Sequence, residues 1–87
     1  MIKVYGKAWC GDCTRSKRFL DDNNIKYEYI DIGQEPQHVD YVLEVNQGHE
    51  SVPTIVFPDG SVLVEPSNRE LAAKLGKPHV DDHEARS

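Results

Sequence analysis

Apolar and polar residues in the first third of the chain follow three regular patterns. The run Ile-Lys-Val-Tyr at residues 2–5 is rich in β-branched and aromatic side chains, which favours a strand, and Gly6 ends it. Residues 12–23 carry apolar or small side chains at helical spacing, whereas charged side chains cover the other faces. That stripe consists of Cys13, Ser16, Phe19 and Leu20. Residues 25–32 alternate between apolar and polar and predict a second strand, so we expect a β-α-β unit here.

The middle of the chain predicts a second helix followed by a hairpin. Pro36 suits the first turn of a helix whose apolar face ends before Asn46-Gln47-Gly48. Residues 54–57 and 61–64 are short apolar runs typical of strands. The intervening Pro58-Asp59-Gly60 favours a tight turn, because Asp-Gly tolerates the backbone angles that such a turn needs. These two strands are therefore expected to be antiparallel.

A third helix is predicted from the start and stop signals at its two ends. Ser67-Asn68-Arg69-Glu70 has the spacing of a capping box, and Gly76 followed by Pro78 is a stop signal. The predicted order is β-α-β-α-β-β-α, an α/β fold in which a four-stranded mixed sheet is flanked by helices. Residues 1–76 form the predicted domain, and residues 77–87, with one large apolar residue, are predicted to be a flexible tail.

Composition narrows the possible functions. The 87 residues are 38% hydrophobic and 29% charged, which fits one small domain that we expect to be a monomer. The net charge of −5 opposes attraction to nucleic acid or to an anionic membrane surface. No apolar run approaches the roughly 20 residues of a membrane span, and the N-terminus lacks the apolar core of a secretory signal. The chain is therefore predicted to be cytoplasmic.

Cys10 and Cys13 are the only cysteines, and their spacing closes too short a loop to stabilise a fold as a disulfide. A cysteine at a helix N-terminus meets unpaired N–H groups and the positive end of the helix dipole, which favour the thiolate. Cys13 lies one turn later on the apolar stripe, where it suits a resolving thiol. The C-x-x-C motif thus predicts redox chemistry, with half of a metal site or two core cysteines as alternatives.

The motif has a recognisable context. Ala8-Trp9-Cys10-Gly11-Asp12-Cys13, together with Ser51-Val52-Pro53, resembles a glutaredoxin-type member of the thioredoxin superfamily over residues 1 to 76. With Glu65-Pro66-Ser67 before the last helix, the chain is most similar to mycoredoxin-like glutaredoxins of bacteria. The resemblance implies the thioredoxin fold and a thiol-disulfide oxidoreductase with Cys10 as nucleophile and Cys13 as resolving cysteine.

The resemblance also implies a substrate-binding set. Pro53 corresponds to a cis-proline that faces the cysteines, and the Val52 backbone pairs with the substrate; an ordinary trans proline at an edge strand is the alternative. Lys7 occupies the position of a lysine that receives a carboxylate of glutathione, although it could instead be a solvated loop residue. Trp9 is expected to be half-exposed beside Cys10, or else packed in the core. Asp12 and Ser67 complete this set.

Two departures from the family pattern affect the expected chemistry. Gly11-Asp12 replaces the common Pro-Tyr between the cysteines, and the Asp12 carboxylate is expected to oppose thiolate formation at Cys10. Glu65-Pro66 replaces the Gly-Gly pair before the last helix, which weakens the case for a γ-glutamyl clamp. The sequence therefore favours mycothiol over glutathione as the small thiol.

The leading interpretation is a dithiol oxidoreductase with no bound cofactor, which reduces protein disulfides or mixed disulfides with a low-molecular-weight thiol, mycothiol or glutathione. One alternative is a redoxin reduced directly by a flavoprotein of the thioredoxin reductase type. Another is an iron-sulfur or zinc module in which Cys10 ligates metal across a dimer. His79 and His83 have the spacing of a metal pair on a helix, but their segment is predicted to be tail.

Overall fold

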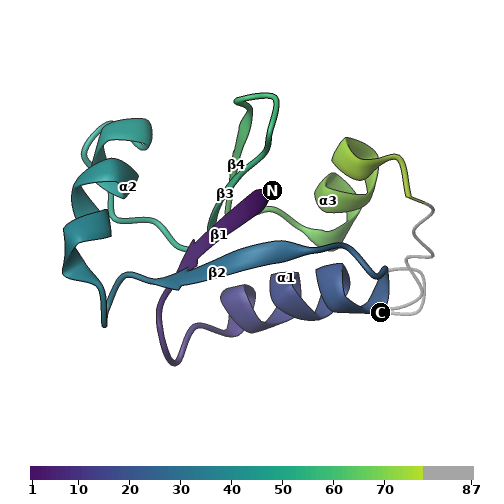
Figure 1. Ribbon diagram of the computed structural model, residues 1–87, viewed down its shortest axis with the longest axis horizontal. Helices are drawn as coiled ribbons and strands as arrows, with labels where there is room; N and C mark the ends of the chain where they lie inside the picture. Colours follow the sequence, from purple (N-terminus) through teal and green to yellow (C-terminus); the bar gives the residue numbers. More distant parts are fainter. Residues whose placement is uncertain (78–87) are drawn as a thin grey trace.

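A four-stranded mixed sheet forms the centre of the molecule (Figure 1). The computed structural model describes residues 1–77. The strand order is β2-β1-β3-β4; β1 and β2 are parallel, whereas β3 is antiparallel to both β1 and β4. The strands are β1 (Ile2–Gly6), β2 (Tyr27–Asp31), β3 (Thr54–Val56) and β4 (Val62–Val64). The predicted parallel pair and antiparallel hairpin are both confirmed.

Three α-helices connect and flank the strands. They are α1 (Gly11–Asp22), α2 (Val39–Val45) and α3 (Asn68–Leu75), and a 3-10 turn, η1 (Pro36–His38), precedes α2. The predicted second helix is thus divided, with Pro36 in the 3-10 turn rather than in the α-helix. The element order agrees with the sequence prediction in every other respect.

The second strand is shorter than its alternating pattern predicted. Residues 23–26 form the turn that ends α1, where the Ile25 N–H donates to the Leu20 carbonyl at 2.9 Å. Asn24 has a positive φ of 58°, which asparagine tolerates better than most residues. Pairing with β1 therefore begins at Tyr27, opposite Ile2.

The sheet is covered on both faces, because buried side chains of β1 point to both: Ile2 and Val4 to one face and Tyr5 to the other. Helices α1 and α3 pack on one face, and α2 packs on the other (Figure 1). The α1 and α3 side buries Ile2, Val4, Phe19, Leu20, Ile55, Phe57, Leu71 and Ala72. The α2 side buries Tyr5, Ile30, Ile32 and Val42. Because α1 is anchored by its apolar stripe, its N-terminal end is held at the end of β1, where the two cysteines lie.

The predicted capping box at the start of α3 is present. The Ser67 hydroxyl accepts a hydrogen bond from the Glu70 N–H at 3.1 Å, and the Glu70 carboxylate accepts one from the Ser67 N–H at 2.8 Å. Gly76 ends the helix in the left-handed conformation with φ 66°, which glycine adopts without steric cost. The predicted stop at Pro78, the flexible tail and the His79/His83 pair lie outside the described residues.

Candidate functional site

Cys10 is the residue that caps the N-terminus of α1. Its backbone is extended, with φ −105° and ψ 108°, and its Sγ accepts a hydrogen bond from the Cys13 N–H at 3.0 Å. The thiol is half-buried, and Sγ lies 3.9 Å from the Val52 carbonyl oxygen. The sulfur thus lies at the N-terminal end of α1 and has a backbone N–H donor. Cys10 therefore has the surroundings of an accessible nucleophile.

Cys13 has the opposite surroundings. Its side chain is 2% exposed and belongs to the buried stripe of α1. Burial, followed by the hydrogen bond with Cys10, raises the pKa of the Cys13 thiol to about 12. At neutral pH Cys13 is therefore protonated, while its own backbone N–H supports the Cys10 sulfur. The two thiols are chemically unequal although they lie one helical turn apart.

The loop before β3 meets the cysteines with a cis peptide bond between Val52 and Pro53, as the resemblance implied. The Thr54 hydroxyl donates to the Ser51 carbonyl at 2.7 Å, and the Glu65 N–H donates to the Pro53 carbonyl at 2.8 Å. These two bonds hold the loop between β3 and the end of β4. Pairing of β3 with β1 starts at Thr54, so the Val52 backbone lies beyond that ladder, beside Cys10.

Trp9 is more exposed than the sequence suggested. Its side chain is 102% exposed, so both the half-exposed lid and the core position were wrong. The backbone explains the difference, since Trp9 has a φ of 63° and this left-handed residue turns the indole away from the sheet. A large aromatic side chain is consequently exposed to solvent at the residue next to Cys10.

Lys7, the expected partner of a thiol carboxylate, already has an acidic partner. Its ammonium forms an ion pair with the Glu50 carboxylate, and both side chains are about two-fifths exposed, at 40% and 37%. Glu50 lies just before the cis-proline loop, so the pair bridges the two segments that carry Cys10 and Val52. An incoming anionic group would therefore compete with Glu50 for Lys7.

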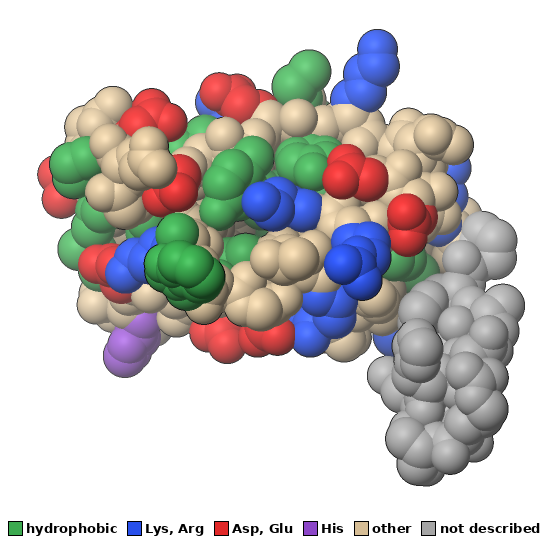
Figure 2. All heavy atoms as spheres, turned by 90° about the horizontal axis from the view of Figure 1, so that it is seen from below, with side chains coloured by type: hydrophobic (Ala, Val, Ile, Leu, Met, Phe, Trp, Pro, Cys, Tyr) green, Lys and Arg blue, Asp and Glu red, His purple; other side chains and the backbone are tan. Residues whose placement is uncertain are grey.

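Asp12 is also paired. Its Oδ1 accepts a hydrogen bond from Arg15 at 2.8 Å, and the other guanidinium nitrogen of Arg15 donates to the Pro66 carbonyl at 3.0 Å. The guanidinium offsets the negative charge that the sequence placed beside Cys10, and it ties α1 to the loop before α3. Figure 2 shows the same mixture over the face that carries α1, where basic and acidic side chains are interspersed.

The remaining candidates do not assemble into a further site. Ser67 uses both its hydroxyl and its N–H in the capping box, so its contact with a substrate stays a prediction. Within residues 1–77, no three His, Cys, Asp or Glu side chains gather where they could hold a metal ion. Among the helices of this same part of the chain, none is long and apolar enough to cross a membrane.

Gly6 and Tyr29 belong to the site but escaped the sequence prediction. A Cβ on Gly6 would lie 2.9 Å from Cys13 Sγ, from Tyr29 Cε1 and from the Tyr29 hydroxyl oxygen. The last residue of β1 must therefore lack a side chain for Cys13 and Tyr29 to pack here. The signal was available, because a glycine within a strand pattern often marks a close approach. Glu50 and Arg15 carried no comparable signal, since only the folded chain gives them partners.

Comparison with known proteins places this site in a family. The family model for glutaredoxin matches residues 2–63. "Putative glutaredoxin Rv3198A" of Mycobacterium tuberculosis is 42% identical over 76 residues, which cover 87% of this chain and 90% of that protein. Mycoredoxin 1 of Corynebacterium glutamicum is 31% identical over 74 residues, which cover 85% of this chain and 91% of the relative. The crystal structure of the thioredoxin-like protein BC3987 superposes with a TM-score of 0.74 at 30% identity, covering 84% of this chain and 97% of that one.

We predict that Gly6→Ala destabilises the protein, because the added methyl group forces Cys13 or the Tyr29 ring to move. Overpacking of this kind costs about 1–3 kcal/mol in the free energy of unfolding, measured by urea denaturation of the reduced protein. Gly11→Ala is the matched control, since nothing lies within 4 Å of its Cβ. Gly11 opens α1, so alanine there should leave stability unchanged or raise it by up to about 1 kcal/mol. Equal stability of the two variants would contradict the packing described.

Proposed function

The chain belongs to the glutaredoxin family of thiol-disulfide oxidoreductases, and we propose that it is a dithiol enzyme in which Cys10 attacks and Cys13 resolves. The observation that carries this assignment is the inequality of the two thiols. Cys10 is half-buried and accepts the Cys13 N–H at 3.0 Å, whereas Cys13 is 2% exposed. One sulfur can meet a disulfide from solution, and the other can act only after the first has reacted.

The two steps follow from this arrangement. The Cys10 thiolate attacks a substrate disulfide, forms a mixed disulfide and expels one substrate thiolate with the electron pair of the broken S–S bond. Cys13 then loses its proton, and its sulfur attacks Cys10 Sγ and releases the second substrate thiolate. The enzyme is left with a Cys10–Cys13 disulfide, which a reduced donor must convert back to the dithiol.

The surfaces around Cys10 suit a disulfide that approaches along the Val52 backbone. The Val52 carbonyl lies 3.9 Å from Cys10 Sγ, so an extended substrate could pair with the loop while its sulfur meets the thiolate. Trp9 offers a fully exposed aromatic surface on which a protein partner could pack. Disulfide-containing proteins are therefore the proposed targets, in a reducing compartment such as the cytoplasm.

For the electron donor we favour a sugar-based thiol such as mycothiol over glutathione. Glu50 forms an ion pair with Lys7, and Lys7 is the residue that would otherwise bind a carboxylate of glutathione. Glu65 is exposed and its N–H is bonded to Pro53, so a second negative charge lies near the cis-proline loop. Carboxylates would be repelled by Glu65, whereas sugar hydroxyls can donate hydrogen bonds to it. The similarity to a protein named mycoredoxin agrees with this choice.

The first prediction concerns the cysteines. Cys10→Ser should abolish disulfide reduction, because it removes the accessible nucleophile. Cys13→Ser should retain the first step and accumulate a mixed disulfide, detected by intact mass and mapped to Cys10 by peptide analysis. Wild-type turnover in the Cys10 variant, or an adduct on Cys13, would refute the assignment.

The second prediction concerns the small thiol. The wild-type enzyme should reduce a mycothiol-linked disulfide faster than the glutathione-linked disulfide of the same peptide. Glu50→Gln should raise the rate with the glutathione adduct about fivefold, since it frees Lys7, and should change the mycothiol rate little. Glu28→Gln removes an equal charge from an exposed position on β2 and serves as the control.

Two outcomes would overturn the choice of donor. Faster wild-type turnover of the glutathione adduct would exclude a preference for mycothiol. Efficient reduction by NADPH and a thioredoxin reductase, without any small thiol, would instead support a redoxin reduced by a flavoprotein.

A further inference from the structure

In the resolving step, the buried Cys13 thiol must lose its proton before it can attack Cys10. Cys13 must become a thiolate before it attacks, yet its side chain is 2% exposed and burial raises its pKa to about 12. The N–H that supports Cys10 belongs to Cys13 and points to the neighbouring sulfur rather than to its own. A backbone hydrogen bond from Lys7 lowers the pKa of Cys13 but does not cancel the effect of burial, so a thiolate at Cys13 needs further groups to stabilise it.

Tyr29 places a hydroxyl beside Cys13. The Tyr29 oxygen and Cys13 Sγ both lie 2.9 Å from one point, the position that a Cβ on Gly6 would take. The hydroxyl has a long contact of 3.4 Å with the Lys7 carbonyl. Burial, with the nearby Cys13 charge as the next cause, raises the pKa of Tyr29 to about 12, so the hydroxyl keeps its proton and can donate it to a hydrogen bond. The hydroxyl has one proton, so this donor must turn away from the Lys7 carbonyl to serve the sulfur.

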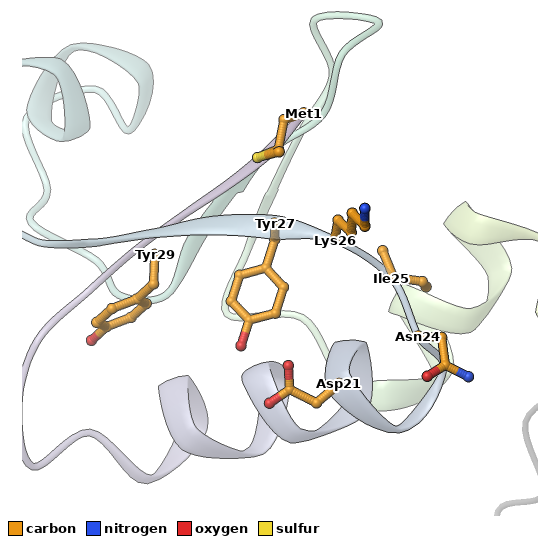
Figure 3. Close-up of a pocket in the computed structure, with 7 residues that line it drawn as sticks. All are labelled: Met1, Asp21, Asn24, Ile25, Lys26, Tyr27 and Tyr29. Atoms are coloured by element: carbon orange, nitrogen blue, oxygen red, sulfur yellow. The ribbon is translucent and has the colours of Figure 1, made fainter.

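The Tyr29 ring also reaches solvent. Figure 3 shows Tyr29 and Tyr27 pointing from β2 toward α1, where they line an open groove of about 710 Å³. Tyr29 is half-buried, so its ring forms the boundary between this groove and the buried thiol.

Lys17 adds a positive charge to the same side. Its Nζ lies 3.9 Å from the centroid of the Tyr29 ring, on the helix that carries both cysteines. The Lys17 charge favours the thiolate of Cys13 and opposes the effect of burial. The aromatic ring holds the ammonium near the sulfur through a cation–π contact.

We propose that Tyr29 and Lys17 are positioning residues for the resolving step: the hydroxyl and the ammonium stabilise the Cys13 thiolate as it forms. The inference rests on the proposed function, in which Cys13 attacks the mixed disulfide at Cys10. Within residues 1–77, neither side chain donates a hydrogen bond to Cys10, and the Cys10 charge acts on Tyr29 less than the Cys13 charge does. The attack of Cys10 on a substrate should therefore depend on them less than the attack of Cys13 does.

The test follows the two steps separately with dithiobis(nitrobenzoate) and the reduced full-length chain. In the first step the Cys10 thiolate bonds to one reagent sulfur and expels one coloured thionitrobenzoate anion. In the second, Cys13 gives its proton to solvent, its sulfur bonds to Cys10 Sγ, and the second coloured anion leaves with the electron pair. The first phase scales with reagent concentration and the second does not, so stopped-flow absorbance separates them.

Tyr29→Phe should slow the second phase about tenfold and leave the first unchanged, because a hydrogen bond to a charged group is lost while the ring is kept. Lys17→Gln should slow the second phase about fivefold, and Lys17→Arg should restore it. Tyr27→Phe is the matched control, since its hydroxyl interacts with Asp21 at the far end of the groove. In a Cys13→Ser background, Tyr29→Phe should have no effect on the single remaining phase.

A second phase of Tyr29→Phe within twofold of wild type would overturn the inference. Equal slowing of both phases would also overturn it, because it would indicate a general structural role. A wild-type protein that releases no first anion would contradict the proposed function itself, and that result is distinguishable from the other two.

Discussion

The arrangement of the site depends on one hydrogen bond, which the Cys13 N–H donates to the Cys10 sulfur. It exists because Cys10 caps α1, and α1 is held by a buried stripe that begins with Cys13 itself. One short interaction therefore joins the chemistry to the hydrophobic core. The same helix geometry leaves Cys10 half-buried at the helix end and turns Cys13 inward, so the two thiols differ in exposure and in surroundings.

The surroundings of the dithiol show how a small domain separates these roles. Gly6 leaves room for Cys13 and Tyr29 under the motif, while the cis-proline loop closes over the other side beside Cys10. Charges near Cys10 occur as pairs, Lys7 with Glu50 and Asp12 with Arg15. Such exposed pairs contribute little to the free energy of unfolding. Because they lie close to Cys10, we interpret them as groups that influence which substrates bind there.

Local patterns predicted most of the fold and the centre of the site. The helix at the C-x-x-C motif, the Asp59-Gly60 turn and the Ser67 capping box each depend on neighbouring residues, which the sequence displays directly. The exposure of Trp9 depends on a backbone conformation that nothing in its neighbours requires, and it was mispredicted. Glu50 and Tyr29 acquire partners only when distant segments meet, so residue type and spacing could not assign them.

The central claim, that Cys10 alone is the accessible nucleophile, is tested most directly by competitive alkylation. The reduced wild-type protein is exposed briefly to limiting iodoacetamide at neutral pH, and the modified peptide fragments are quantified by mass spectrometry. We expect modification of Cys10 to exceed that of Cys13 at least about tenfold, because the reagent can reach the half-buried Cys10 sulfur, whereas the Cys13 side chain is 2% exposed. Comparable modification of the two cysteines, or earlier modification of Cys13, would contradict the account.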